Sequence, residues 1–221
     1  MKLQSPQIHE LIESLQIDSR TTGRLERFCH LVLDANLRIN LISRGGDQTA
    51  EVERQLFLSL SALPFIPVGT SLTWLDIGSG GGFPALPIAL CRERVELTLA
   101  ESIAKKAFFL ERTIEALEIP NVTVANIRVG QNGEGLEANQ GRFDWVSVKA
   151  VTDWGQTLNW GRSLLSRGGK LLTYKPDRPT DEEIRTFRRF DFELIGEMEI
   201  MDSRESPSVR IIVLESQLTD N

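Results

Sequence analysis

Cysteine and histidine are scarce in this chain of 221 residues, which has two of each. Cys29 and Cys91 lie far apart, and with only His9 and His30 to accompany them the ligand spacings of a zinc site are missing. Two cysteines are also too few for the disulfide framework of a small secreted domain. We therefore expect no metal site, and we expect both cysteines to be core residues.

Long apolar runs are missing as well. The longest, within residues 83–91, is far shorter than the roughly 20 residues that a membrane-spanning helix needs. Residues 1–6 lack the apolar core of a signal peptide. These absences lead us to expect a cytoplasmic protein with no membrane partner, and we expect it to be a monomer.

An excess of basic charge is also absent, because the formal net charge is −6. Phosphate neutralisation needs clustered Lys and Arg, so this charge speaks against a nucleic-acid partner. The acid is unevenly distributed, however: residues 177–221 carry 6 basic and 12 acidic side chains, whereas residues 71–176 carry 12 and 11. Nearly all of the surplus acid therefore lies in the C-terminal segment, and the charge of the rest of the chain does not speak against a nucleic-acid partner.

Apolar residues at helical spacing dominate the first 70 residues. A first helix begins at Ser5-Pro6, which suits a cap and a first helical position. A second helix runs from about Ser19 toward Asn40, and a third follows Asp47 and ends before residue 64. The sequence therefore predicts an N-terminal helical region over residues 1–70.

From residue 71 short apolar runs alternate with amphipathic segments, a pattern typical of a parallel sheet covered by helices. Strands are expected over residues 72–77, 95–101, 122–126, 143–148 and 170–174, with helices over 84–92, 102–118 and 152–166. A helix near 180–189 and strands over 192–201 and 209–215 close the chain. This order predicts a Rossmann-like α/β domain over residues 71–221.

A glycine-rich loop, Gly78-Ser79-Gly80-Gly81-Gly82, follows the first expected strand, which ends near Asp76. In an open α/β sheet, ligands bind beyond the carboxyl ends of the strands, and glycine lets the backbone approach them closely. Glu101 follows Gly82 by 19 residues at the end of the second strand, where a carboxylate can accept both ribose hydroxyls. Asp76 suits the ammonium group of a methionine. These residues predict an S-adenosylmethionine site in a class I methyltransferase fold, with seven mostly parallel strands and an antiparallel last strand.

Other enzymes of this architecture fit less well. Gly80, Gly82 and Ala85 formally satisfy the G-x-G-x-x-A spacing of dinucleotide enzymes, but Asp76 suits a pyrophosphate poorly and no second catalytic domain follows. The fourth strand ends in Val148-Lys149-Ala150-Val151, without the paired acids of an aminopropyl transferase, the Asn/Asp-Pro-Pro-aromatic motif of amino-methyltransferases or the cysteine of cytosine-carbon enzymes. A nucleophile that needs no proton removed, such as a ring nitrogen, remains.

The glycine loop and its flanks also carry a family resemblance. Residues 74–84 read Trp-Leu-Asp-Ile-Gly-Ser-Gly-Gly-Gly-Phe-Pro, and residues 99–102 read Leu-Ala-Glu-Ser, followed by Lys105-Lys106 and Phe109-Leu110. Together they resemble the glucose-inhibited division protein B family, whose members are guanine-N7 methyltransferases of the 16S ribosomal RNA in the small subunit. The likeness covers most of residues 30–176 and includes Asn40-Leu41, Arg54, Phe143-Asp144 and Tyr174-Lys175.

The resemblance implies that Gly78 and Phe83 line the methionine end of the cofactor, Val129 and Gly130 the adenine end, and Lys149 the mouth where the methyl group is transferred. The full set of expected cofactor-binding residues is Asp76, Gly78, Ser79, Gly80, Gly82, Phe83, Glu101, Ser102, Arg128, Val129, Gly130 and Lys149. RNA is expected to contact Asn40, Arg44, Arg54, Lys149 and Lys175, with Lys149 and Lys175 as the catalytic residues and Arg162 and Arg178 as further basic candidates.

The chain departs from the family pattern at several positions, mainly on the side that faces RNA. Lys149 stands where an Arg is usual, Gly130 where an acid is usual, and Pro176 where a Gly is usual. Residues 55–59 read Gln-Leu-Phe-Leu-Ser in place of His-x-x-Asp-Ser. A small-molecule methyltransferase of the same fold, and a lapsed module that binds cofactor and RNA without turnover, therefore stay open as alternatives.

Overall fold

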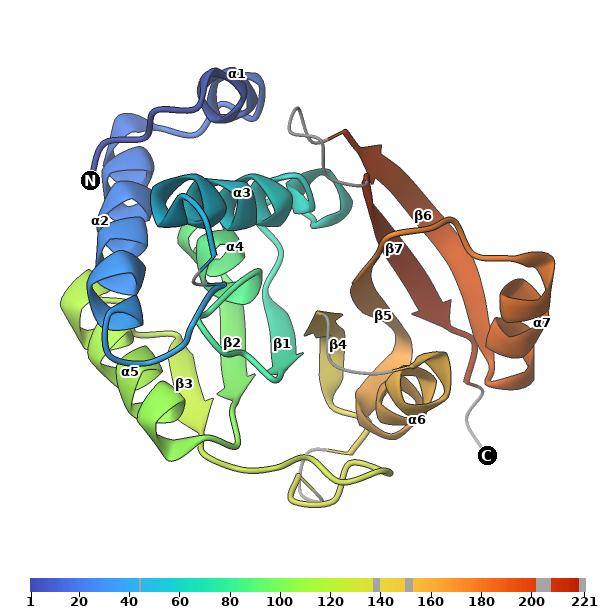
Figure 1. Ribbon diagram of the computed structural model, residues 1–221. Coiled ribbons are helices and arrows are strands. Elements are labelled where there is room, and N and C mark those ends of the chain that lie inside the picture. Colours follow the sequence, from blue (N-terminus) through green and yellow to red (C-terminus); the bar gives the residue numbers. More distant parts are fainter. Residues whose placement is uncertain (44, 137–139, 150–152, 202–207, 219–221) are drawn as a thin grey trace. The chain divides into compact units, whose positions relative to one another are not determined.

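The computed structural model describes residues 1–43, 45–136, 140–149, 153–201 and 208–218 (Figure 1). Its helices are α1 (Pro6–Ser14), α2 (Ser19–Asn36), α3 (Gln48–Leu60), the 3-10 turn η1 (Leu63–Phe65), α4 (Ala85–Cys91), α5 (Ala104–Leu117), α6 (Trp154–Leu164) and α7 (Asp181–Arg189). Its strands are β1 (Leu72–Ile77), β2 (Val95–Ala100), β3 (Val122–Ala125), β4 (Phe143–Lys149), β5 (Leu165–Lys175), β6 (Phe192–Ile200) and β7 (Val209–Ser216).

The strands form a seven-stranded sheet in the order β3-β2-β1-β4-β5-β7-β6. β2 and β3 are parallel, β1, β4 and β5 are parallel, and β7 runs antiparallel to both β5 and β6. The expected mostly parallel sheet with an antiparallel last strand is confirmed. The order of winding reverses between β1 and β4, so the carboxyl ends of these two strands flank the place where this kind of sheet binds its ligands.

The chain divides into two compact units, which are described one at a time. The first unit contains Met1–Ser71 and Ser79–Asn126, and the second contains Leu72–Gly78 and Ile127–Asn221. Across the described residues, no helix combines the length and apolar character needed to cross a bilayer. Nor do three or more His, Cys, Asp or Glu side chains gather there in a group that could hold a metal ion.

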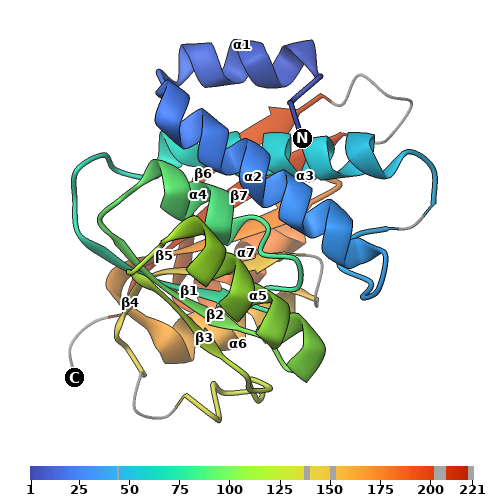
Figure 2. The same cartoon turned by 90° about the vertical axis from the view of Figure 1, so that its left-hand side faces the viewer.

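In the first unit, α2 packs against α3, α4 and α5 (Figure 2). Asp18 caps its start by accepting a hydrogen bond from the Thr21 amide at 2.8 Å. We expected this helix to run toward Asn40, but it ends at Asn36. The Asn36 side chain explains the end, because its Oδ1 accepts from the amides of Leu41 at 2.8 Å and Ile42 at 3.1 Å and so turns the chain.

In the second unit, β5 begins at Leu165, five residues earlier than the start at residue 170 expected from the sequence. Leu165 pairs with Phe143, but the next register pair is Trp145 with Lys170, so the strand carries a bulge. Glycine permits it: a Cβ at Gly169 would lie 2.8 Å from the Ser166 carbonyl oxygen. The helix α6 correspondingly ends at Leu164, before residue 166 where we expected it to end.

The two cysteines differ in burial. Cys29 lies in the core of the first unit, as expected, whereas Cys91 at the end of α4 is only partly buried. Burial raises the pKa of each thiol to about 12. Both therefore stay protonated at neutral pH, which makes them weak nucleophiles.

Candidate functional site

Glu101 ties the glycine loop to the end of β2 within the first unit. The Gly80 amide donates to Glu101 Oε2 at 2.8 Å, and the Ile103 amide donates to Oε1 at 2.8 Å. The side chain of Asn126 holds the Glu101 carbonyl at 2.7 Å, and Glu101 is only 5% exposed. Each carboxylate oxygen has a second lone pair, so both can accept a further hydrogen bond from a ligand.

The loop has a backbone that side chains would obstruct. Gly78, Gly80 and Gly82 all have positive φ, at 74°, 53° and 89°. A Cβ at Gly82 would also lie 2.6 Å from Leu86 Cδ1. Without side chains at these three positions, a ligand can approach the backbone of the loop closely. Phe83 is 7% exposed, and the centre of its ring lies 4.9 Å from the centre of the Phe28 ring.

Asp76 is fixed by a hydrogen-bond relay inside the second unit. Asp76 and Ser147 are register partners on β1 and β4, and the Ser147 hydroxyl donates to Asp76 Oδ1. Trp74 Nε1 in turn donates to Ser147 Oγ at 2.8 Å. All three side chains are at most 2% exposed. The relay therefore orients a buried carboxylate at the carboxyl end of β1, and we did not foresee Ser147, although a hydroxyl on a buried strand requires a partner.

The two lysines that we expected to be catalytic stand at the ends of neighbouring strands, each beside an aromatic ring. Lys149 is the register partner of Tyr174, and its Nζ lies 5.9 Å from the centre of that ring. Lys175 Nζ lies 4.7 Å from the centre of the Trp154 ring. Both separations are within the range of a cation–π contact, so the rings help to hold the ammonium groups.

Burial shifts the pKa of two side chains near these strand ends. Partial burial lowers the pKa of Lys175 below its usual value, and the charges of Glu183 and Asp153 act in the opposite direction. Burial raises the pKa of the Tyr174 phenol well above its usual range, and the charge of Asp76 adds to this effect. Tyr174 is therefore a neutral, apolar surface for Lys149 rather than a base.

Glu134 places an acid beside Gly130, the position at which this chain departs from the family pattern by lacking one. A Cβ at Gly130 would lie 2.3 Å from Glu134 Oε2, so this carboxylate fills the space of a residue-130 side chain. The amide and the side-chain nitrogen of Asn132 hold the carboxylate at 2.8 and 3.1 Å, and the amide is the main cause of a lowered Glu134 pKa. Trp160 Nε1 donates to the Gly130 carbonyl. Sequence reasoning missed Glu134 because its place depends on how this loop folds.

Gln55 and Leu58, which depart from the family pattern, both make structural contacts within the first unit. Gln55 Nε2 donates to Glu51 Oε1 at 2.6 Å, and Leu58 is 5% exposed in the core of the first unit. Ser59 donates its hydroxyl to the Gln55 carbonyl at 2.7 Å. These contacts support the helix itself and its packing.

The expected RNA-binding residues have different environments. Asn40 is exposed, Arg54 Nη1 lies 4.0 Å from Glu51 Oε1, and Arg44 lies outside the described residues. Arg162 pairs with Asp191 at 3.3 Å. Of the remaining predicted contacts, Ser102 and Arg128 are exposed and Ser79 is 2% exposed.

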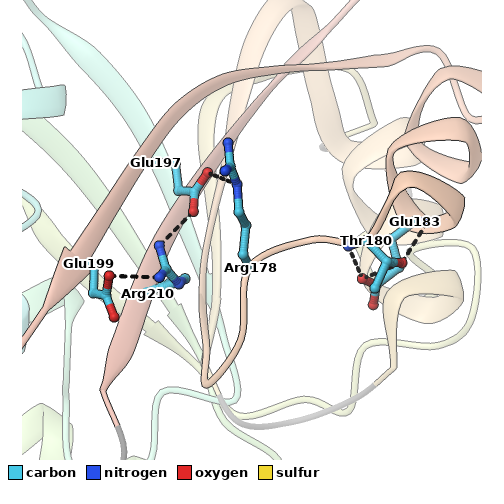
Figure 3. A network of polar contacts seen from close by, with 6 residues as sticks. All are labelled: Arg178, Thr180, Glu183, Glu197, Glu199 and Arg210. Carbon is cyan, nitrogen blue, oxygen red and sulfur yellow. Dashed lines mark hydrogen bonds and ion pairs between the residues drawn. The ribbon is translucent and has the colours of Figure 1, made fainter.

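Arg178 belongs to a network of charges on the second unit (Figure 3). Its Nε lies 3.1 Å from Glu197 Oε2, while Arg210 bridges Glu197 at 2.8 Å and Glu199 at 2.6 Å. The network joins β6 and β7, on which Glu199 and Arg210 are register partners. Because Arg178 is paired with an acid of its own unit, it is a weaker candidate for RNA contact than the strand-end lysines.

The sheet order, the glycine loop and the acid that directly follows β2 define the class of Rossmann-like methyltransferases. Two solved structures share the fold: the Precorrin-6y C5,15-methyltransferase from Geobacter metallireducens GS-15 (TM-score 0.51, 16% identity, covering 80% of this chain and 91% of that one) and P. horikoshii TYW2 in complex with MeSAdo (TM-score 0.58, 14% identity, covering 81% and 66%).

Sequence comparison narrows the class to one family. The family model for rRNA small subunit methyltransferase G matches residues 21–206, and the chain belongs to this family. Its relatives include the Ribosomal RNA small subunit methyltransferase G of Acidiphilium cryptum (35% identity over 181 residues, 81% of this chain and 79% of the relative). The protein of the same name from Roseiflexus castenholzii is 30% identical over 171 residues, which are 77% of this chain and 72% of the relative.

Proposed function

We propose that this protein transfers a methyl group from S-adenosylmethionine to N7 of a guanine in the 16S ribosomal RNA of the small subunit. Membership of the rRNA small subunit methyltransferase G family supports the reaction and the substrate. The observation that carries the cofactor assignment is the bond from the Gly80 amide to Glu101, which joins the glycine loop to the acid expected at the ribose.

The residues present suit this cofactor. Gly80 and Gly82 keep side chains out of the loop, Glu101 has acceptor capacity for two ribose hydroxyls, and Asp76 is a buried acid suited to the methionine ammonium. Gly78 and Phe83 are proposed for the methionine end, Val129, Gly130 and Arg128 for the adenine end, and Ser79 and Ser102 as further contacts. When bound, S-adenosylmethionine supplies an electrophilic methyl group.

The side chains of the chain would then act by positioning rather than by proton transfer. Guanine N7 attacks through a lone pair and has no proton to lose, so no general base is needed. Lys149 and Lys175 are proposed to hold the anionic RNA so that the nitrogen and the methyl carbon lie in line, about 3 Å apart. The aromatic rings beside both ammonium groups support this role, because they restrict the positions of otherwise mobile cations.

The remaining parts of the proposal follow from the substrate. We propose that the protein works in the cytoplasm, together with the ribosomal RNA, and that it needs neither a metal nor a second copy of the chain, because catalysis by positioning requires neither. We propose Asn40, Arg44 and Arg54 as further RNA contacts, and a domain boundary near residue 70.

Mass spectrometric mapping of nucleosides in 16S ribosomal RNA tests the reaction directly. Unmodified 16S RNA and unmodified small subunits are each incubated with the protein and S-adenosylmethionine, and we expect one new 7-methylguanosine in at least one of them. Calorimetry with S-adenosylhomocysteine tests the cofactor separately, with NAD as the control. Cofactor binding without RNA methylation would contradict the substrate, and equal affinity for NAD would contradict the cofactor.

A further inference from the structure

A cleft lined by arginine lies on the first unit, where α2 meets the end of α5. It has a volume of about 300 Å³ and is lined by Arg20, Gly23, Arg24, Arg27, Leu117 and Glu118. The four α2 residues are spaced three and four apart, so they share one face of the helix. The two helices pack against each other, as Figures 1 and 2 both show.

Arg24 is held in place at the centre of this face. Its Nη2 donates to the carbonyl oxygens of Leu117 at 2.7 Å and Glu118 at 3.3 Å. These carbonyls end α5, where the helix itself offers no donor for them. A guanidinium has five N–H groups, so three remain outside these two bonds and can bind a ligand. One cation of the cleft is therefore rigid before any ligand arrives.

Gly23 leaves the cleft open. It lies inside an 18-residue helix, where glycine is less favourable than alanine. A Cβ built at this position meets nothing within 4 Å, so packing does not require a glycine. Any larger side chain here would project between the arginines, and glycine leaves that space to a ligand.

The charges of the cleft favour an anion. Three arginines face one acid, Glu118, in a chain whose formal net charge is −6. Arg20 and Arg27 are exposed. Asp18 is a second acid near the cleft: its carboxylate accepts from the amide and hydroxyl of Thr21 at 2.8 and 3.1 Å and is attracted to Arg20, so three arginines stand against two acids. Guanidinium groups match the geometry of phosphate oxygens better than a point charge does.

The cleft is remote from the acid expected at the ribose. α5 has 14 residues, begins three residues after Glu101 and ends at the cleft. A helix of that length spans about 20 Å. A large substrate that reaches both places would therefore gain affinity from the cleft. The cleft itself would not touch the reacting atoms.

We propose that this arginine cleft binds backbone phosphates of the substrate RNA at a distance from the methylated base. The inference rests on the proposed function, since it takes RNA as the substrate. It assigns Arg20, Arg24 and Arg27 to affinity for the RNA and not to the methyl-transfer step. Contacts to phosphates carry no base information, so the cleft positions the RNA without reading its sequence.

A pair of substitutions at Gly23 isolates the charge of the cleft. Gly23→Glu and Gly23→Gln add side chains of the same size to the same open space, but only the first adds an anion among the arginines. Binding of in vitro transcribed 16S RNA is measured by filter retention in the presence of S-adenosylhomocysteine. We expect Gly23→Glu to weaken RNA binding roughly tenfold more than Gly23→Gln, because it removes phosphate contacts.

Two double variants that each remove two exposed arginines test the place of the lost charge. Arg20→Ala with Arg27→Ala removes two exposed arginines of α2, and Arg185→Ala with Arg188→Ala removes two exposed arginines of α7. We expect the α2 pair to raise the KM for RNA about tenfold at unchanged kcat. A plot of the logarithm of the RNA binding constant against the logarithm of the salt concentration should become shallower by about two in slope, because two phosphate contacts are lost. The α7 pair should change neither quantity.

Affinity for S-adenosylhomocysteine equal to that of the wild type, and an unfolding temperature close to or above that of the wild type, verify that all four proteins fold. The two Gly23 variants should unfold at a slightly higher temperature, because glycine is unfavourable inside a helix. Equal RNA affinity for Gly23→Glu and Gly23→Gln would overturn the proposal that the cleft binds RNA phosphates. Equal effects of the α2 and α7 pairs would overturn it as well. A fall in kcat at saturating RNA would contradict its remote role. Failure of the proposed function looks different: the wild type would bind RNA through the cleft and transfer no methyl group.

Discussion

The glycine loop with Glu101 and the strand ends with Lys149 and Lys175 are built in different ways. Backbone amides hold the first region, since Gly80 and Ile103 both donate to the Glu101 carboxylate. Side chains hold the second, where each lysine lies beside an aromatic ring. A backbone-built region tolerates few substitutions, whereas a region built from side chains can exchange one cation for another. The difference agrees with the sequence, which keeps the family pattern in the loop and departs from it at Lys149.

Gly80→Val should have the largest effect, because it attacks the backbone-built region directly. A β-branched residue is strained at the Gly80 φ of 53°, and its side chain would enter the space that the ligand needs. We expect calorimetry to detect no binding of S-adenosylhomocysteine. Gly46→Val is the control, since Gly46 also has positive φ, at 72°, but a Cβ there meets nothing within 4 Å. Equal losses in both variants would attribute the effect to strain alone.

Lys149→Ala tests the side-chain-built region. We expect methyl transfer to RNA to fall roughly 100-fold, as for other losses of positioning, while affinity for S-adenosylhomocysteine changes much less. Lys149→Arg should keep or raise activity, because a guanidinium forks onto phosphate or base edges. Lys170→Ala is the control, since Lys170 Nζ also lies 5.9 Å from a ring centre, that of Trp145, near the start of the parallel pairing of β5 with β4. Unchanged RNA methylation by Lys149→Ala would remove Lys149 from the catalytic residues.

A swap between residues 130 and 134 tests whether the carboxylate beside Gly130 contributes to cofactor binding. Glu134→Ala should weaken binding of S-adenosylhomocysteine about tenfold, the typical size of a lost charge-assisted hydrogen bond. Gly130→Glu alone should also weaken it, because the new side chain meets Glu134 Oε2. The double variant should recover most of the affinity. Losses that simply add in the double variant would show that the two positions do not share one role.

Ser147→Ala should have the smallest effect on cofactor affinity, a loss of a few-fold. It removes the hydroxyl that joins Trp74 to Asp76, which leaves the buried indole N–H without its acceptor and costs about 1–3 kcal/mol of stability. Ser147→Thr retains a hydroxyl and should behave more like the wild type. Denaturant unfolding and calorimetry check the two effects separately. A loss of stability at unchanged affinity would make Ser147 a packing residue only.

Much of the fold could be predicted from the sequence because it depends on local periodicity. The seven strands, their approximate bounds and the antiparallel last strand were all expected, and so was the loop after β1. The errors occurred where a single side chain or glycine alters an element. Asn36 ends α2 early through contacts with Leu41 and Ile42, and the bulge at Gly169 lets β5 begin early. Neither effect has a periodic signature.

Some features of the candidate site could likewise be predicted from the sequence, and others depend on contacts between distant residues. The loop and Glu101 follow from a short run of residues and one spacing, because backbone geometry there depends on glycines that are adjacent in the chain. The bonds of Ser147 to Asp76 and of Arg24 to Leu117 join residues 71 and 93 positions apart. The place of Glu134 depends on the path of a loop, and the arginine cleft on the packing of two helices. Contacts of these kinds form only when the chain has folded, since no local pattern specifies which distant groups will meet.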